Sequence, residues 1–202
     1  MGLSLESMAI EMPAVFGHPN RVAFRGVLTV VDVPSDRAPA GARGHRVMLK
    51  KTAAEAAIPS LLGMALDYSP RFDAHDARRK IGVITRAEIA GGEIAVAGFL
   101  YGRDFPEIVA EIGRPGRLDT RCADKSVRTT QANAGSIVDG TRANGGGAPG
   151  ARAVLGMSYE IADAVVEDTK ATIWVLTRVT FTGAAVLRRD KAAYSSTWIT
   201  LG

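Results

Sequence analysis

The chain has 202 residues, of which 47% are hydrophobic and 23% charged, and its formal net charge is +4. This balance is typical of one folded domain with a substantial core, and it excludes wholesale disorder. The single cysteine, Cys122, excludes an internal disulfide, and the sequence has neither a signal-peptide pattern nor an apolar run long enough to span a membrane, so we expect a reducing, intracellular setting.

The first regular elements that the sequence predicts are a strand and a helical stretch. Residues 22–33 alternate between apolar and polar and are rich in β-branched side chains, which predicts a β-strand. Residues 51–66 are rich in Ala and Leu at helical spacing and are interrupted by Pro59. Because proline breaks or kinks a helix, we expect one or two short helices there.

A β-hairpin is predicted over residues 81–101. Both halves of this segment alternate, and Gly91 and Gly92 between them tolerate the positive φ that tight hairpin turns require. Asp104 follows, with a proline and a glutamate at the spacing of a capping box. This pattern predicts a helix over residues 105–112 that Asp104 caps.

The composition changes over residues 113–150, which are rich in Gly, Ala and Arg and poor in large apolar residues. Such a segment buries too little area to offset its ordering entropy of about 1–2 kcal/mol per residue, so we expect a flexible insertion. Seven basic and three acidic residues between 112 and 152 carry the whole net charge. A basic insertion without aromatic interleaving is a weak indication of nucleic-acid binding.

Beyond the insertion, residues 155–166 and 173–182 read as strands, 186–194 as a helix or turn, and 195–201 as a final strand. The predicted fold is mainly β with short helices (α+β), as a small, closed or partly closed antiparallel β-barrel flanked by helices. The whole chain, residues 1–202, is expected to form a single domain that contains the insertion.

Three histidines could serve as a catalytic base. His18 lies in a turn near the N-terminus, and His45 lies between two arginines whose charge disfavours its protonated form. Both fit solvated loop positions. His75 stands just before the predicted hairpin, where loops commonly deliver site residues, and it is flanked by Asp73 and Asp76. A surface histidine in a charged patch is an equally good interpretation of His75.

Ser158 lies in the stretch LGMSYE at the start of a predicted strand. A serine nucleophile needs a base within hydrogen-bond reach, and the G-x-S motif lacks the second glycine of a nucleophile elbow. The nearby acidic pairs at 160/163 and 167/168 fit solvent-facing positions. No phosphate-binding loop or metal-ligand cluster occurs in the sequence, so we expect neither a metal nor a cofactor.

The order of the short motifs resembles that of the prohead, or capsid-maturation, serine proteases of tailed phages, whose fold is similar to herpesvirus assemblin. The likeness covers roughly residues 22–194 without the insertion. The motifs that carry it are His75-Asp76 with Ile81-Gly82, Gly92-Glu93 through Ala97-Gly98-Phe99-Leu100, Asp104 to Ile112, Leu155-Gly156-Met157-Ser158, and Thr182-Gly183-Ala184-Ala185.

The resemblance implies that Ser158 is the nucleophile and His75 the general base. The strand after the serine supplies no carboxylate or imidazole where the family has its third catalytic member, so Thr180 is the candidate there, with Asp73 or Asp76 as alternatives. Arg188 and Arg189, which follow that strand, correspond to the arginine pair that forms the oxyanion hole in assemblin-like enzymes. A solvated charge run is the alternative interpretation of that pair.

The implied activity is cleavage of the scaffold and major capsid proteins inside the assembling procapsid, in the host cytoplasm. Self-cleavage at the chain's own termini or in the insertion, and assembly into homo-oligomers, are compatible with this role. The alternative is a catalytically inactive homologue that acts as a structural or scaffold-associated protein in head assembly, and the missing acidic third member motivates it.

Overall fold

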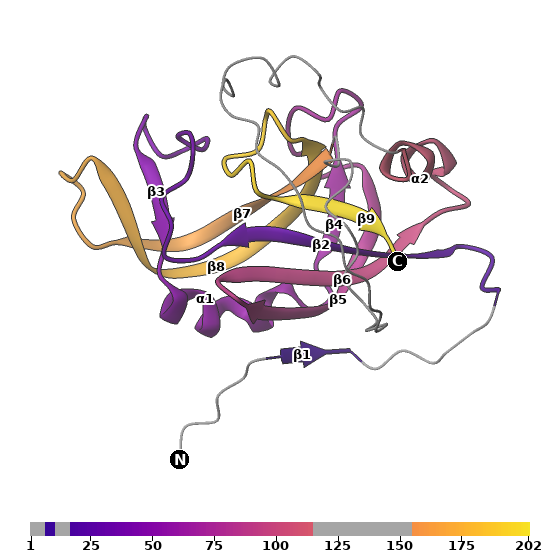
Figure 1. Ribbon diagram of the computed structural model, residues 1–202, viewed down its shortest axis with the longest axis horizontal. Coiled ribbons are helices and arrows are strands. Elements are labelled where there is room, and N and C mark those ends of the chain that lie inside the picture. Colours follow the sequence, from indigo (N-terminus) through magenta and orange to yellow (C-terminus); the bar gives the residue numbers. More distant parts are fainter. Residues whose placement is uncertain (1–6, 11–16, 115–154) are drawn as a thin grey trace, which may run out of the picture.

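The fold is a strongly curled sheet with two short α-helices in the described part of the chain (Figure 1). The computed structural model describes residues 7–10, 17–114 and 155–202. The expectation of a mainly β protein with short helices is therefore confirmed. Apart from Gly113 and Arg114, the predicted insertion lies outside the described residues.

The strands are β1 (Ser7–Ala9), β2 (Arg21–Val30), β3 (Arg46–Leu49), β4 (Ala65–Tyr68), β5 (Lys80–Ala90), β6 (Glu93–Tyr101), β7 (Leu155–Val166), β8 (Ile173–Arg188) and β9 (Trp198–Leu201). The helices are α1 (Lys51–Ala57), the 3₁₀ helix η1 (Ile58–Leu61) and α2 (Pro106–Ile112). No helix in this described part is long and apolar enough to cross a membrane.

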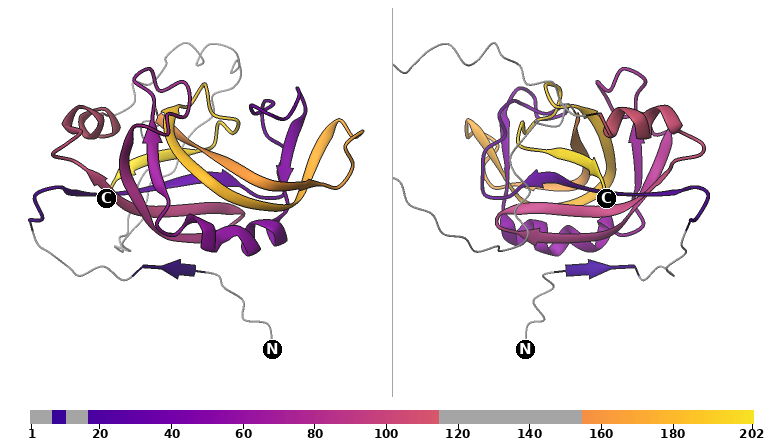
Figure 2. Two further views of the ribbon diagram at one scale, coloured as in Figure 1. Left: turned by 180° about the vertical axis from the view of Figure 1, so that it is seen from behind. Right: turned by 45° about the vertical axis from the view of Figure 1, so that its right-hand side comes forward.

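The sheet is mixed, so the expectation of a purely antiparallel barrel is wrong. Its main path runs β3-β8-β4-β5-β6-β2-β9, while β1 pairs with β5 and β7 pairs with β8. Both β3 and β4 run parallel to β8, and the remaining pairs are antiparallel. The α1–η1 segment connects β3 to β4, and both of these short strands pair with β8. The result is a half-barrel rather than a closed one (Figure 2).

The predicted hairpin is confirmed as β5 and β6, and Gly91 and Gly92 take positive φ values of 57° and 85° at its turn. The helix after it is confirmed as α2, but its predicted cap is wrong. The helix makes no side-chain capping bond, and the carboxylate of Asp104 instead accepts a hydrogen bond from the side-chain amide of Asn20 at 2.7 Å. Asp104 thus links the start of β2 to the end of the hairpin.

Two segments differ from the predicted elements. Residues 186–188, expected to be helical or a turn, continue β8, and only the residues after them form turns and bends. Residues 65–68 form strand β4 although 65 and 66 belong to the stretch predicted as helical. The helical stretch ends at Leu61 and the chain turns through Gly63 at φ 76°, so β4 can enter the sheet between β5 and β8.

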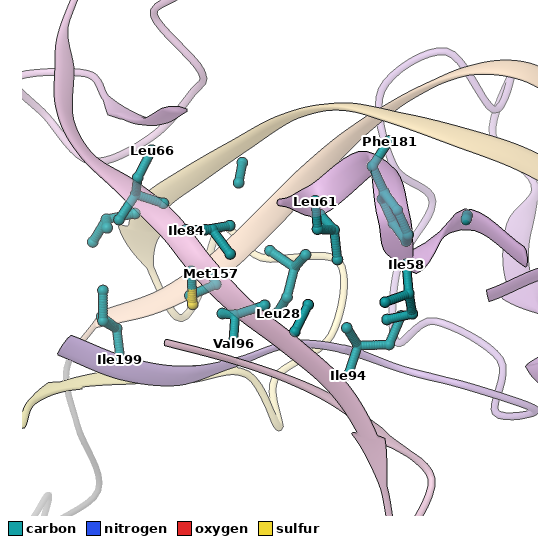
Figure 3. Close-up of a cluster of buried hydrophobic side chains, with 14 of the residues drawn as sticks. Leu28, Ile58, Leu61, Leu66, Ile84, Ile94, Val96, Met157, Phe181 and Ile199 are labelled. Atoms are coloured by element: carbon teal, nitrogen blue, oxygen red, sulfur yellow. The ribbon is translucent and has the colours of Figure 1, made fainter. Parts of the chain in front are cut away.

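The core fills the concave side of the sheet with aliphatic and aromatic side chains from most strands and from η1 (Figure 3). Leu28, Ile84 and Ile94 are fully buried, and Phe181 and Met157 are 2% and 1% exposed. Each such side chain contributes about 1.5–3 kcal/mol by leaving water. The small residues of α1 allow it to pack closely on β8.

Truncating Ile94 to alanine should lower the free energy of unfolding by about 2–5 kcal/mol, because it leaves a cavity in a fully buried site. Val33, which is 50% exposed, provides the matched control, and Val33→Ala should change stability by less than about 0.5 kcal/mol. Urea unfolding followed by circular dichroism measures both. Equal effects of the two substitutions would contradict this core assignment.

Candidate active site

Three strands bring Ser158 and an acidic residue, Asp67, into one row. Strand β8 lies between β4 and β7, and its residue Ala185 is opposite Asp67 on β4 and opposite Ser158 on β7. Directly opposed residues of neighbouring strands point to the same face of a sheet. Asp67, Ala185 and Ser158 therefore share one face, with only a methyl group between the carboxylate and the hydroxyl.

The loop between β4 and β5 carries His75 onto this same face. The hydroxyl of Ser69 donates to the Asp73 carboxylate at 2.8 Å and accepts from the Asp73 N–H at 3.1 Å. The carbonyl of Phe72 accepts from the main-chain N–H of Arg188 at 2.7 Å, which ties the loop to the end of β8. These bonds fix the backbone that positions His75.

Asp67 is the residue that the structure places against His75. Its side chain is 1% exposed, and its Oδ1 lies 3.5 Å from Nδ1 of His75 and accepts a hydrogen bond from the Asp76 N–H at 3.2 Å. Lys80 Nζ lies 3.3 Å from Oδ2. Burial raises the pKa of Asp67, but His75, the Asp76 N–H and Lys80 outweigh it, so the pKa lies below its ordinary value and the carboxyl is ionised at neutral pH.

A second carboxylate, that of Glu160, approaches the same ring nitrogen. Its Oε1 lies 3.8 Å from Nδ1 of His75, and its side chain is 53% exposed. The side chain lies over Gly183, where an added Cβ would come within 2.7 Å of Oε2. Glycine at position 183 thus makes room for Glu160. Both carboxylates lie on the Nδ1 side, which leaves Nε2 as the ring nitrogen available for proton transfer.

His75 and Ser158 both line a cavity of about 590 Å³. The ring nitrogens of His75 are buried and have no hydrogen-bond partner within the described part of the chain, so the base and the hydroxyl are not hydrogen-bonded to each other. Catalytic hydrogen bonds are often long or unformed in unliganded enzymes and tighten when substrate binds. Because both side chains border the same cavity, a substrate bound there would meet both of them.

The glycine of the G-x-S motif has a packing role. An added Cβ on Gly156 would lie 2.7 Å from the hydroxyl oxygen of Thr197, and that same oxygen accepts a hydrogen bond from the N–H of Met157. Gly156 therefore lets β7 approach the segment before β9. The absence of a nucleophile elbow follows from this geometry, because Ser158 stands on a continuous strand.

The three third members that the sequence suggested, Thr180, Asp73 and Asp76, all have side-chain partners other than His75. The hydroxyl of Thr180 donates to the carboxylate of Asp163 at 3.3 Å on an exposed part of β8. Asp73 bonds to Ser69, and the side chain of Asp76 pairs with Arg79 at 3.3 Å. Asp67, which sequence reasoning did not single out, is the buried carboxylate that lies 3.5 Å from Nδ1 of His75.

Of the arginine pair, Arg188 is bound to Asp190. Its guanidinium makes hydrogen bonds of 2.9 and 2.6 Å to that carboxylate, which raise the pKa of Arg188, and its side chain is exposed. Arg189 is half-buried, and its Cα lies 3.6 Å from the position of a Cβ on Gly156. Neither arginine is among the residues that line the cavity.

The other two histidines lie apart from the row. Nδ1 of His18 accepts a hydrogen bond from the Asn20 N–H at 3.1 Å, and the ring of His45 stacks on Trp174 with the ring centroids 4.5 Å apart. No group of three His, Cys, Asp or Glu side chains in the described part of the chain is arranged to hold a metal ion. The side chains that do gather at the site are carboxylates, an imidazole and a hydroxyl, which are the groups used in acid–base and nucleophilic chemistry.

Comparison of the chain with protein-family models, with curated proteins and with solved structures finds no match in any of the three. The class of protein that the fold and site define is accordingly a mainly β half-barrel with a Ser, His and Asp constellation on one face.

Replacing Asp67 with asparagine should alter the pH dependence of stability. A carboxyl whose pKa is lowered by folding stabilises the native state above its unfolded pKa of about 3.9, and this contribution is lost as pH falls through the folded pKa. Asp67→Asn should therefore be less stable than the wild type at pH 7, and the difference should shrink below about pH 4. Urea unfolding at a series of pH values measures this.

Asp168→Asn is the matched control, because Asp168 is exposed in a turn and an amide can still accept its bond from the Lys170 N–H. Its stability difference from the wild type should be small at every pH. A pH-independent loss in Asp67→Asn would show that Asp67 is not an ionised buried partner of His75.

Proposed function

We propose that this protein is a serine endopeptidase with Ser158 as nucleophile, His75 as general base and Asp67 as the acidic third member. The observation that carries the proposal is the row across β8, in which Asp67 and Ser158 share a face and His75 lies against Asp67 in the cavity that Ser158 lines. A serine becomes a nucleophile at neutral pH only with such a base, and the base acts best when a carboxylate orients it.

In the proposed reaction, Oγ of Ser158 attacks the carbonyl carbon of a peptide bond while Nε2 of His75 takes the hydroxyl proton. The C–N bond then breaks, the leaving amine receives that proton, and an acyl-enzyme remains. Water, deprotonated by His75, attacks the ester, and its cleavage releases the acid and restores the Ser158 hydroxyl. The ionised carboxylate of Asp67 stabilises the imidazolium that forms in each half of the reaction.

The oxyanion donor that we propose is Arg189. Its Cα lies 3.6 Å from the position of a Cβ on Gly156, which stands two positions before the nucleophile. Removing one oxyanion donor typically costs about 10²- to 10³-fold in rate. Substitution of Arg189 should thus affect the chemical step more than substitution of Arg188.

The biological role that we propose follows from the resemblance to prohead proteases: cleavage of scaffold and major capsid proteins inside the assembling procapsid. The order of motifs around His75 and Ser158 supports it. The alternative is an inactive homologue with a structural role in head assembly. The unformed hydrogen bond between His75 and Ser158 favours that alternative. The alternative was first suggested by the lack of an acidic third member, and the position of Asp67 beside His75 argues against it on that point.

A fluorophosphonate probe tests the catalytic machinery without knowledge of the substrate. Oγ of an activated serine displaces fluoride from phosphorus, so the wild type should be labelled on Ser158, as peptide mass spectrometry can show. Ser158→Ala should abolish labelling, and His75→Gln and Asp67→Asn should slow it by about 10²- to 10⁴-fold, because the base is lost or held in the wrong tautomer.

Ser195→Ala is the matched control, because Ser195 is exposed on a loop and lies outside the cavity lining. It should be labelled at the wild-type rate. A wild-type protein that is folded but unlabelled, or labelled equally after Ser158→Ala, would favour the inactive homologue.

Co-expression with the cognate capsid and scaffold proteins tests the biological role. The wild type should convert them to shorter products, and Ser158→Ala should leave them at full length, as seen by gel electrophoresis and intact-mass measurement. Identical band patterns from a labelled wild type and from Ser158→Ala would contradict the capsid-maturation role while leaving the peptidase assignment intact.

A further inference from the structure

The cavity beside Ser158 has mostly apolar walls. It is built from β2, β3, β7, β8 and the loop before β3, and its volume of about 590 Å³ lies within the range of ligand sites. Side chains from these segments form the apolar wall: Leu28, Ala42, Val47, Met157, Trp174 and Leu176. A site with such walls gains free energy mainly by taking apolar surface out of water.

The polar groups of the cavity do not favour an acidic ligand. Among the described residues no lysine or arginine lines it, and the one carboxylate that does, that of Glu160, would repel an anion. Glu160 is directed toward His75 and lies over Gly183, so it is not aimed into the apolar part as a partner for a cation. The hydroxyl of Tyr194, another lining residue, already donates to the carbonyl of Val47 at 3.1 Å.

One edge of β7 lies next to this cavity and is open in the sense that no other described strand pairs with it, since β7 pairs only with β8. The N–H of Met157 donates to Thr197 rather than to β8, and the N–H of Arg188, which is opposite Leu155 on β8, donates to Phe72. Main-chain groups in an antiparallel pair alternate between facing the partner strand and facing away. The odd-numbered residues at the start of β7 therefore turn their main-chain groups away from β8. Tyr159 continues this alternation. Its N–H and C=O can thus bond an extended peptide.

We propose that this cavity is the subsite for a large apolar side chain, aromatic or branched aliphatic, of an extended peptide that pairs with the open edge of β7 at Tyr159. The inference rests on the proposed function and names its substrate class. Pairing with Tyr159 places the peptide next to Ser158, and the apolar side chain then fixes which bond is cut.

A peptide library tests the subsite. The full-length wild type is incubated with a defined mixture of peptides, and cut sites are read by mass spectrometry. Aromatic or branched aliphatic residues should be enriched at one fixed position within about three residues of the cut. Ala164 lines the cavity on β7, so Ala164→Phe should narrow the cavity. The rate at which this variant cleaves the best peptide should fall by about 10-fold or more, whereas its rate of fluorophosphonate labelling should stay close to that of the wild type.

Ala162→Phe is the matched control, because Ala162 is also exposed on β7 but does not line the cavity, and it should leave cleavage and labelling unchanged. If the enzyme is labelled but shows no preference for apolar residues, or prefers lysine or arginine through Glu160, the proposed subsite is wrong while the proposed function stands. A wild type that is neither labelled nor active would overturn the proposed function and this inference with it.

Discussion

The buried charge of Asp67 is the constraint on which the site depends. A carboxylate with 1% of its side chain exposed is tolerated in a sheet only if other groups replace its lost hydration. The Asp76 N–H, Lys80 and His75 supply these interactions, and two of the three come from the loop that follows β4. Satisfying Asp67 therefore folds that loop onto the sheet, and His75 is carried over the row that contains Ser158.

The mixed topology makes this arrangement available. Because β4 and β7 lie on opposite edges of β8, two residues from distant parts of the chain flank Ala185. Small residues on that stretch of β8 leave space for the side chains that meet there. Ala185 separates Asp67 from Ser158 by only a methyl group, and Gly183 leaves the space that the Glu160 side chain fills. Larger residues there would occupy the place of the imidazole and the second carboxylate.

The open edge of β7 is the place where the proposed peptide substrate would lie next to the proposed nucleophile. β7 carries Ser158 on one face and directs Tyr159 main-chain groups toward the cavity side, so a peptide bound along this strand meets the nucleophile and the apolar walls together. Peptide backbones give such binding its affinity, and side-chain pockets give it specificity. A half-barrel has room for this strand, whereas a closed barrel would have used the edge for its own pairing.

The sequence by itself determined the elements that rest on local pattern. Alternation and paired glycines predicted the β5–β6 hairpin, and proline with helical spacing predicted α1 and α2; motif order singled out His75 and Ser158. Only the tertiary structure decided that Asp67 lies against His75. Its strand is four residues long, too short for a readable alternation, and it borders a helical stretch. Its position beside His75 arises from register with β8 and from burial, which depend on distant parts of the chain, so no pattern within the stretch could reveal it.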